Sequence, residues 1–313
     1  MIDLDGCKVE FFLASGSRGF DGKGYRWKLW ETILEGLGLI DPSLFVSVLK
    51  SISAKSHIGN RPFRKAVKLI SENGRVVSPL RALVQPKSIA GTVNAIGLDN
   101  PGFMYWLNEI YPEIVKRKLK VIFSAVMIGR EREDEFLGMI YRLNELKNIL
   151  AIEFNPSCPN NPHLLDNPDK VVSFTSVISQ TSRYPLILKL GYGQDYCGIA
   201  RRTEEFIRAF SINAVPWSMV DFPDVISPLA EFGGGGVSGK AAQKYTWKMI
   251  KELVAITSRP VIAPSIWDSG DIEKVYELGA SAISFGAVGL PFAWRPTKFA
   301  REWMKNKGGR DDC

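Results

Sequence analysis

A cysteine lies between two prolines and two asparagines in the segment Asn155-Pro-Ser-Cys-Pro-Asn160. The preceding residues, 150–154, form a short apolar run that is typical of a buried parallel strand. Proline fixes φ and donates no backbone hydrogen bond, so this strand must end at the prolines. The segment therefore predicts a thiol on a rigid loop at the carboxyl end of a strand, where α/β proteins build their sites. The two amides, Asn155 and Asn160, can donate to and accept from a planar polar ligand. A buried cysteine in a proline-rich turn is the alternative.

Further polar or small residues follow other apolar runs of the chain, and these are Ser15, Gly16, Lys55, Lys189 and Asn213. Lys189 lies inside the run Leu186-Ile-Leu-Lys-Leu190, where its charge is costly unless it meets an anion. Each residue also has an ordinary interpretation. Lys189 can extend its amine to solvent, Lys55 can be a surface residue, and Asn94 can close a turn.

A run of glycines, Gly233-Gly-Gly-Gly-Val-Ser-Gly239, precedes a predicted helix. Glycine exposes backbone N–H groups, and a helix start carries a partial positive charge, so this run is a candidate phosphate cradle. The spacing is not that of a Walker loop. A flexible loop is an equally good interpretation.

The elements that must position these residues alternate regularly. Strand-like runs cover residues 8–14, 44–54, 120–126, 150–154, 185–190, 211–215, 260–263 and 281–285. Helical spacing covers residues 27–37, 101–117, 131–146, 167–182, 199–210, 240–257, 268–278 and 295–306. Residues 79–101 and 216–239 are predicted to be irregular. Eight β/α units predict a single (β/α)₈ TIM barrel over residues 1–313, in which the strand ends converge on one face. A doubly wound open sheet is the alternative fold.

The composition excludes several functional classes. The chain has 313 residues, of which 45% are hydrophobic and 23% charged, so it is typical of globular proteins. No apolar run approaches the ~20 residues that cross a bilayer, and the first residues do not resemble a signal peptide, so a cytoplasmic protein is expected. Four cysteines without CxxC spacing and only two histidines argue against a metal site.

The net charge is +7, but its basic residues are scattered, so we expect a small-molecule substrate and no nucleic-acid or membrane partner. A homodimer is the default expectation for the oligomeric state.

Several motifs in one colinear order resemble the dihydroorotate dehydrogenase family, in particular its soluble class 1 members. The matching segments are Ala14-Ser-Gly16, Lys55-Ser with Gly59-Asn60, Asn94-Ala-Ile-Gly-Leu-Asp-Asn-Pro-Gly102, Asn155-Pro-Ser-Cys-Pro-Asn160, Lys189, Ile212-Asn213 and Gly235-Gly-Val-Ser-Gly-Lys240. The resemblance covers nearly the whole chain and implies an FMN-binding barrel.

The resemblance implies a role for each matching residue. Cys158 would be the base that removes a proton from C5 of (S)-dihydroorotate while hydride leaves C6 for FMN, as in de novo pyrimidine biosynthesis. Lys55 would lie near flavin and substrate and favour developing negative charge. Four amides would bind the pyrimidine and its carboxylate, and these are Asn94, Asn155, Asn160 and Asn213. The residues that would contact the flavin are Ser15, Gly16, Lys55, Lys189, Gly236, Gly239, Gly286 and Ala287.

The sequence departs from the family pattern at three places. Ala263-Pro-Ser-Ile-Trp267 stands where the family has a glycine pair for the FMN phosphate, and Ser265 is expected to supply a hydroxyl instead. Ala287 replaces a common threonine. Ala214 follows Asn213 where a serine or threonine usually helps to hold orotate.

Three alternatives to this function stay open. One is an FMN barrel that acts on another dihydropyrimidine, and a second is a tRNA-dihydrouridine synthase, whose downstream histidine motif is missing here. A flavin-binding barrel without catalysis is the third. The resemblance leaves fumarate and a nicotinamide cofactor, reached through a partner subunit, as candidate electron acceptors, while quinone is disfavoured.

Overall fold

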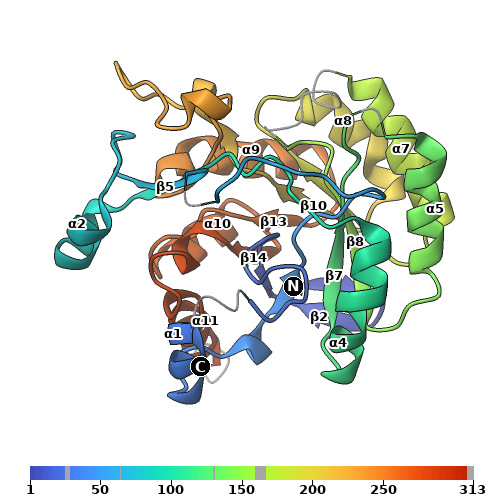
Figure 1. Cartoon of the computed structure of the whole chain (residues 1–313), viewed down its shortest axis with the longest axis horizontal. Coiled ribbons are helices and arrows are strands. Elements are labelled where there is room, and N and C mark those ends of the chain that lie inside the picture. The colour runs from blue at the N-terminus through green and yellow to red at the C-terminus, as the bar shows by residue number, and fades with distance from the viewer. Residues whose placement is uncertain (25–28, 64, 130, 159–166, 309–313) are drawn as a thin grey trace.

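Eight parallel strands close into a barrel in the computed structural model, which describes residues 1–24, 29–63, 65–129, 131–158 and 167–308 (Figure 1). In chain order the barrel strands are β3 (Phe11–Leu13), β4 (Val46–Val48), β7 (Val121–Ala125), β8 (Ile149–Phe154), β9 (Leu186–Leu190), β10 (Ala209–Ile212), β13 (Val261–Ala263) and β14 (Ala282–Phe285). The barrel closes because β14 pairs with β3. Closure confirms the predicted TIM barrel and excludes an open sheet.

Helices cover the barrel between these strands (Figure 1). The longer ones are α1 (Leu29–Gly36), α5 (Glu133–Leu143), α7 (Pro168–Thr181), α8 (Tyr196–Thr203), α9 (Gln243–Ile256), α10 (Asp271–Glu277) and α11 (Arg295–Gly308). β7 and β9 are buried along their whole length, which explains their unbroken apolar sequences. No helix in the described ranges is long and apolar enough to span a bilayer.

A short hairpin closes the amino-terminal end of the barrel. The predicted strand 8–14 is in fact two strands, because β1 (Ile2–Leu4) and β2 (Cys7–Val9) pair antiparallel before β3 begins. Asp5 and Gly6 make the turn, both with positive φ. Ile2, Leu4 and Val9 are buried in one cluster with side chains from the barrel strands. The hairpin therefore plugs the barrel.

A second sheet was not predicted. β5 (Val67–Ile70), β6 (Gly91–Asn94), β11 (Val215–Pro216) and β12 (Gly236–Gly239) form an antiparallel sheet in the order β11-β12-β6-β5. It lies at the carboxyl-terminal face, because β11 begins three residues after β10 ends. Segments 79–101 and 216–239, expected to be irregular, supply β6 and β12 together with α2 (Pro79–Val84).

Short helices complete the chain and correct other expected boundaries. The helix predicted over 101–117 is divided into α3 (Phe103–Tyr105), a π-helix η3 (Trp106–Ile110) and α4 (Tyr111–Lys116). Pro112 cannot donate to the carbonyl four residues earlier, and a π-turn accommodates this loss. The strand predicted over 44–54 ends at Val48. The short 3₁₀ helices are η1 (Pro42–Leu44), η2 (Pro86–Ser88), η4 (Glu204–Phe206), η5 (Trp217–Met219), η6 (Ala230–Phe232), η7 (Lys240–Ala242) and η8 (Ala287–Gly289).

Candidate active site

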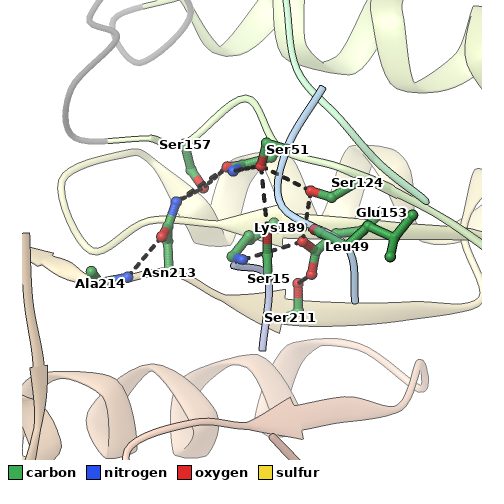
Figure 2. A network of polar contacts seen from close by, with 11 residues as sticks. Ser15, Leu49, Ser51, Ser124, Glu153, Ser157, Lys189, Ser211, Asn213 and Ala214 are labelled. Atoms are coloured by element: carbon green, nitrogen blue, oxygen red, sulfur yellow. Dashed lines mark hydrogen bonds and ion pairs between the residues drawn. The ribbon is translucent and has the colours of Figure 1, made fainter. Parts of the chain in front are cut away.

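A chain of hydrogen bonds crosses the carboxyl-terminal part of the barrel, with the Glu153 carboxylate at its centre (Figure 2). Glu153 on β8 accepts from Ser124 Oγ of β7 at 3.1 Å and from Ser211 Oγ of β10 at 2.9 Å. It also accepts from Lys189 Nζ of β9 at 3.2 Å. Both charged side chains are buried. Lys189 therefore meets the anion that its position in an apolar strand required.

Beside this pair lies a cluster of two amides and a hydroxyl, which we call the amide cluster: Asn155, Ser157 and Asn213. Figure 2 shows Ser157 and Asn213 to the left of Lys189. Asn213 Nδ2 donates to Asn155 Oδ1 and to Ser157 Oγ, both at 3.1 Å. Asn213 Oδ1 accepts from the backbone N–H of Ala214 at 2.8 Å. Asn155 and Asn213 follow β8 and β10, the two strands that flank β9, so the barrel brings these two predicted residues together.

The cluster continues to the first two barrel strands through Ser51. Asn155 Nδ2 donates to Ser51 Oγ at 3.3 Å, and Ser51 Oγ is 3.0 Å from Ser124 Oγ. Ser15 Oγ donates to the carbonyl of Leu49 at 2.9 Å and lies 3.4 Å from Ser51 Oγ. Gly16, with φ +87, follows in the conformation that glycine favours. Ser15 thus belongs to the same network as Asn155.

Cys158 is buried and follows Ser157 of the amide cluster. Ser157, the residue before Cys158, donates to Asn155 Oδ1 and accepts from Asn213 Nδ2. Pro159 and Asn160 lie outside the described residues. Cys7 and Cys197 lie elsewhere, on β2 and α8, and both are partly exposed. Of these three thiols, Cys158 alone adjoins the polar network.

Lys55 does not lie in this network. Its side chain is 68% exposed, and its Nζ forms an ion pair with Glu135 of α5 at 2.8 Å. Lys50, which the sequence interpretation passed over, is partly buried two residues beyond β4. Gly16 packs toward it, since a Cβ on Gly16 would lie 3.9 Å from Lys50 Cγ. The geometry favours Lys50 over Lys55 as the lysine of this face.

The surroundings of Lys50 are unusual for a cation. Its Nζ donates to the carbonyl of Asp99 at 2.5 Å and lies 4.8 Å and 5.2 Å from the ring centroids of Phe20 and Phe63. Burial lowers the pKa of Lys50 to about 8, and the Asp99 carboxylate opposes part of this shift. The sequence could have indicated this residue, because it has two Lys-Ser pairs ahead of Gly59-Asn60, Lys50-Ser51 and Lys55-Ser56, and either could match the Lys-Ser motif.

The glycine run has a structural role in the sheet. Gly236 and Gly239 of β12 pair with Asn94 and Gly91 of β6. A Cβ on Gly239 would lie 2.9 Å from Gly91 Cα and 2.8 Å from the Trp267 ring, so close packing requires glycine there. Residues 236–239 are therefore a strand and not a loop cradle. Asn94, at the end of β6, belongs to this second sheet and not to the amide cluster.

The ends of β13 and β14 can be tested for a phosphate site. Pro264 has no N–H, and the N–H groups of Trp267 and Asp268 donate to Asp271 Oδ2 at 3.0 Å and 2.9 Å. Ser265 adopts a positive φ of 65°, which a glycine would adopt with less strain. Next door, Gly286 precedes η8, which begins at Ala287. Compared with a glycine pair, these residues would offer a phosphate fewer backbone N–H donors.

The remaining residues fit a flavin ring. Lys50 and Lys189 place two amines at the carboxyl-terminal face, and Ser15 and Gly16 follow β3, which lies between β14 and β4. A Cβ on Gly286 would lie 3.1 Å from Ala14 Cβ, so glycine lets these two strand ends approach closely. These donors therefore suit a ring with carbonyl and N–H groups, whereas the ends of β13 and β14 offer fewer donors for a phosphate.

Comparison with known proteins identifies related sequences. A family model described as dihydroorotate dehydrogenase matches residues 79–292. The catalytic subunit of dihydroorotate dehydrogenase B (NAD(+)) from Latilactobacillus sakei subsp. sakei (strain 23K) is 29% identical over 214 residues, which cover 65% of this chain and 69% of the relative. The subunit of the same name from Malacoplasma penetrans (strain HF-2) is 27% identical over 230 residues, with 71% and 73% covered.

The family match begins after the first two barrel strands. Asn155, Cys158, Lys189 and Asn213 lie inside the matched range, whereas Ser15 and Lys50 precede it. The hydrogen bonds of Ser15 and Ser51 join the unmatched strands to the same network. The hydrogen-bond network thus extends beyond residues 79–292, which the family model matches.

Proposed function

Because the chain belongs to the dihydroorotate dehydrogenase family, whose members are oxidoreductases acting on a CH–CH bond, we propose that it oxidises (S)-dihydroorotate to orotate. The observation that carries this proposal is the amide cluster at the carboxyl-terminal face of the barrel, in which the buried Asn155 and Ser157 directly precede Cys158 and Asn213 donates to both. De novo pyrimidine biosynthesis is the pathway in which this reaction occurs, and a cytoplasmic enzyme fits it.

We propose FMN as the cofactor, held by one domain comprising residues 1–313. When bound, FMN supplies the acceptor for the hydride that leaves the substrate. Lys189 and Lys50 would bind the ring, and Ser15 and Gly16 would lie beside it. Ser265, Gly286 and Ala287 would bind the phosphate end. Gly236 and Gly239 would support the site through the second sheet, since their backbones are paired with β6.

Cys158 would take the proton from C5 of the substrate. An ordinary thiol has a pKa near ~8.5, so the thiolate must be stabilised for work near neutral pH. A protonated Lys50 at the same face would favour negative charge in the site. Its lowered pKa of about 8 makes that charge dependent on pH.

The asparagines would bind the pyrimidine by exchanging partners. Both Nδ2 hydrogens of Asn213 are used within the amide cluster, and Asn155 Oδ1 accepts from Asn213 and from Ser157 at 3.4 Å. A substrate carbonyl that takes a hydrogen bond from Asn213 must therefore replace one of these internal bonds. Asn94 and Asn160 would complete the binding set if the second sheet and the loop after Cys158 contact the substrate.

The names of the relatives bear on the electron acceptor. They are catalytic subunits of a NAD(+) enzyme, so we propose that a partner subunit passes electrons from this chain to NAD⁺. A homodimer of this chain would form the core of such an assembly.

The first prediction tests the reaction. The purified protein should be yellow, and anaerobic mixing with (S)-dihydroorotate should bleach the flavin absorbance in a stopped-flow spectrometer. Cys158→Ser should slow this bleaching by roughly 10²- to 10⁴-fold near pH 7, because a hydroxyl is a much poorer base. Part of the rate should return as pH rises.

Cys197→Ser is the matched control, since Cys197 lies on α8 and burial raises the pKa of its thiol. It should react as the wild type does. Bleaching by dihydrouracil but not by dihydroorotate would disprove the named substrate and favour a neutral dihydropyrimidine. A colourless protein that FMN cannot reconstitute would exclude a flavin enzyme.

A further inference from the structure

The Asp99 carboxylate links the loop after β6 to the loop after β4. Its Oδ1 accepts from the backbone N–H of Gly59 at 3.2 Å and from Arg61, whose Nε and Nη2 lie 3.1 Å and 2.9 Å away. The side chain of Asp99 is 10% exposed, whereas that of Arg61 is 61% exposed. The carboxylate therefore lies inside the fold, and its arginine partner reaches it from the surface.

Backbone contacts hold the same two loops together. His57 and Asn100 exchange two backbone hydrogen bonds, each of 2.9 Å. A Cβ on Gly59 would lie 2.8 Å from the backbone nitrogen of Asp99, so glycine permits this close approach. The position of Asp99 relative to the loop after β4 is therefore fixed by several contacts.

Lys50, which begins the loop after β4, contacts Asp99 at a different atom. Its Nζ donates to the backbone carbonyl of Asp99 at 2.5 Å. Asp99 thus holds Lys50 through its backbone and Arg61 through its side chain. Lys50 directly precedes Ser51, whose hydroxyl accepts from Asn155 of the amide cluster at 3.3 Å. Asp99 can therefore act on the candidate site through Lys50.

Within the described residues, the Lys50 ammonium is acted on by two charged side chains of opposite sign. Burial is the main cause of the lowered pKa of Lys50, which is about 8. The Asp99 carboxylate raises this pKa, and the Arg61 guanidinium lowers it. Because Arg61 is hydrogen-bonded to Asp99, the charge that Lys50 meets is that of an ion pair and not of a free carboxylate.

We propose that Asp99 is a positioning residue for Lys50: its carbonyl fixes the ammonium, its carboxylate favours the charged form, and Arg61 offsets part of that second effect. The contribution of Lys50 to the reaction rests on the proposed function, in which a protonated lysine favours negative charge in the site. In this scheme Asp99 and Arg61 act through Lys50 and take no part in proton transfer.

Two substitutions separate the charges of this ion pair from its structural role. Asp99→Asn keeps an oxygen for the Gly59 N–H and removes the negative charge, so the pKa of Lys50 should fall. Arg61→Gln removes the positive charge, so the same pKa should rise. A purely structural role would loosen the two loops and admit water to Lys50 in both variants, which would raise its pKa in both.

Competitive acetylation of lysine amines from about pH 6 to about pH 11, followed by peptide mass spectrometry, measures the pKa of Lys50 in the full chain without substrate. The exposed Lys55 is an internal reference in the same digest. At pH 7 the neutral fraction of Lys50 should change by roughly two- to fivefold, upwards in Asp99→Asn and downwards in Arg61→Gln.

Arg301→Gln is the matched control. Arg301 lies on α11, and its Nη2 is also 2.9 Å from an aspartate oxygen, Asp41 Oδ2. This substitution removes an ion pair of the same kind away from the two loops, so it should leave the pKa of Lys50 at its wild-type value.

The pH profile of flavin bleaching by (S)-dihydroorotate is the second measurement. The rate should rise with pH as the Cys158 thiolate forms and fall again as Lys50 loses its proton, which gives a bell-shaped profile. The alkaline limb should move to lower pH in Asp99→Asn and to higher pH in Arg61→Gln. The acid limb should stay in place in both variants.

The outcomes distinguish this inference from the proposed function. An unchanged or raised pKa of Lys50 in Asp99→Asn would show that the inference is wrong, whether or not the protein oxidises dihydroorotate. Opposite shifts in the two variants without movement of the alkaline limb would overturn the link between this ion pair and the reaction. If dihydroorotate does not reduce the wild type, the proposed function fails, and the acetylation measurement still decides whether Asp99 sets the charge of Lys50.

Discussion

Lys50 holds its ammonium group between two aromatic rings and donates to a backbone carbonyl of Asp99. Such a site solvates the charge less well than water does, which is the reason that its pKa falls to about 8. Lys55, five residues later, keeps its ammonium in solvent beside Glu135. Two lysines in similar sequence contexts therefore have different surroundings, because Lys50 lies at a partly buried strand end and Lys55 lies in an exposed segment.

A second prediction follows from this difference. The pKa of Lys50 falls from 10.5 in the unfolded chain to about 8, so between these values the unfolded state binds the proton more often. Folding stability contributed by this group therefore rises as pH increases from about 8 towards 10.5, by up to about 3 kcal/mol. Lys50→Met should lack this rise in urea unfolding measured without ligand.

Lys55→Met is the matched control and should follow the wild-type pH profile, because Lys55 is largely exposed. The relevant quantity is the difference in unfolding free energy between wild type and each variant at pH 7 and pH 10. If the wild-type and Lys50→Met profiles are parallel over this range, Lys50 is not held as a destabilised cation.

Strand β12 connects the second sheet to the barrel. Gly236 and Gly239 pair with β6, and the side of Gly239 lies against Gly91 and the Trp267 ring. Trp267 follows β13, one of the barrel strands. This contact fastens the second sheet to the carboxyl-terminal end of the barrel, beside the residues proposed to bind the phosphate.

The third prediction concerns this contact. Gly239→Ala should destabilise the protein by about 1–3 kcal/mol, since the new Cβ would lie 2.8 Å from the Trp267 ring and φ is +94. Flavin should also be retained less well. Gly270→Ala is the control, because its Cβ would meet no described atom within 4 Å and its φ is −67. Chemical unfolding of the two variants would show the difference, and equal stability would contradict the packing role of Gly239.

The two ends of the barrel differ in the side chains that they carry: apolar packing lies at one end and the polar candidate site at the other. The hairpin β1–β2 buries Ile2 and Leu4 in a cluster at the amino-terminal end. Polar side chains lie at the opposite end, around Glu153 and the amide cluster (Figure 2). Apolar side chains fill the amino-terminal end, as is usual in this fold.

A fourth prediction tests this division. Leu4→Ala should lower the free energy of unfolding by about 2–5 kcal/mol, because Leu4 is 1% exposed and its truncation leaves a cavity. The rate of flavin bleaching by dihydroorotate should stay near the wild-type value in the folded protein. Leu80→Ala, at a position 72% exposed on α2, is the control and should leave stability nearly unchanged. A large loss of activity in folded Leu4→Ala would contradict the separation of the two ends.

The sequence by itself determined the barrel, because strands buried on both faces leave unbroken apolar runs and helices leave a 3.6-residue spacing. It also singled out Asn155, Cys158, Lys189 and Asn213, since prolines and polar residues interrupt those runs, but the strand predicted over 211–215 is in fact β10 at Ala209–Ile212. The second sheet was missed because β5, β6, β11 and β12 have only two to four residues each, and they gain their regularity from pairing between segments distant in sequence.

Only the tertiary structure distinguished Lys50 from Lys55 and showed that, among the described residues, the buried Nε2 of Gln194 has no hydrogen-bond partner. Both depend on burial, which is set by residues distant in sequence. Phe20, Phe63 and Asp99 surround Lys50, while the turn after β9 lies against Ser157 through the barrel register. Local sequence specifies which side chains can ionise or donate. Desolvation of such a side chain, as at Lys50, arises only when the fold places residues from separate strands and loops around it.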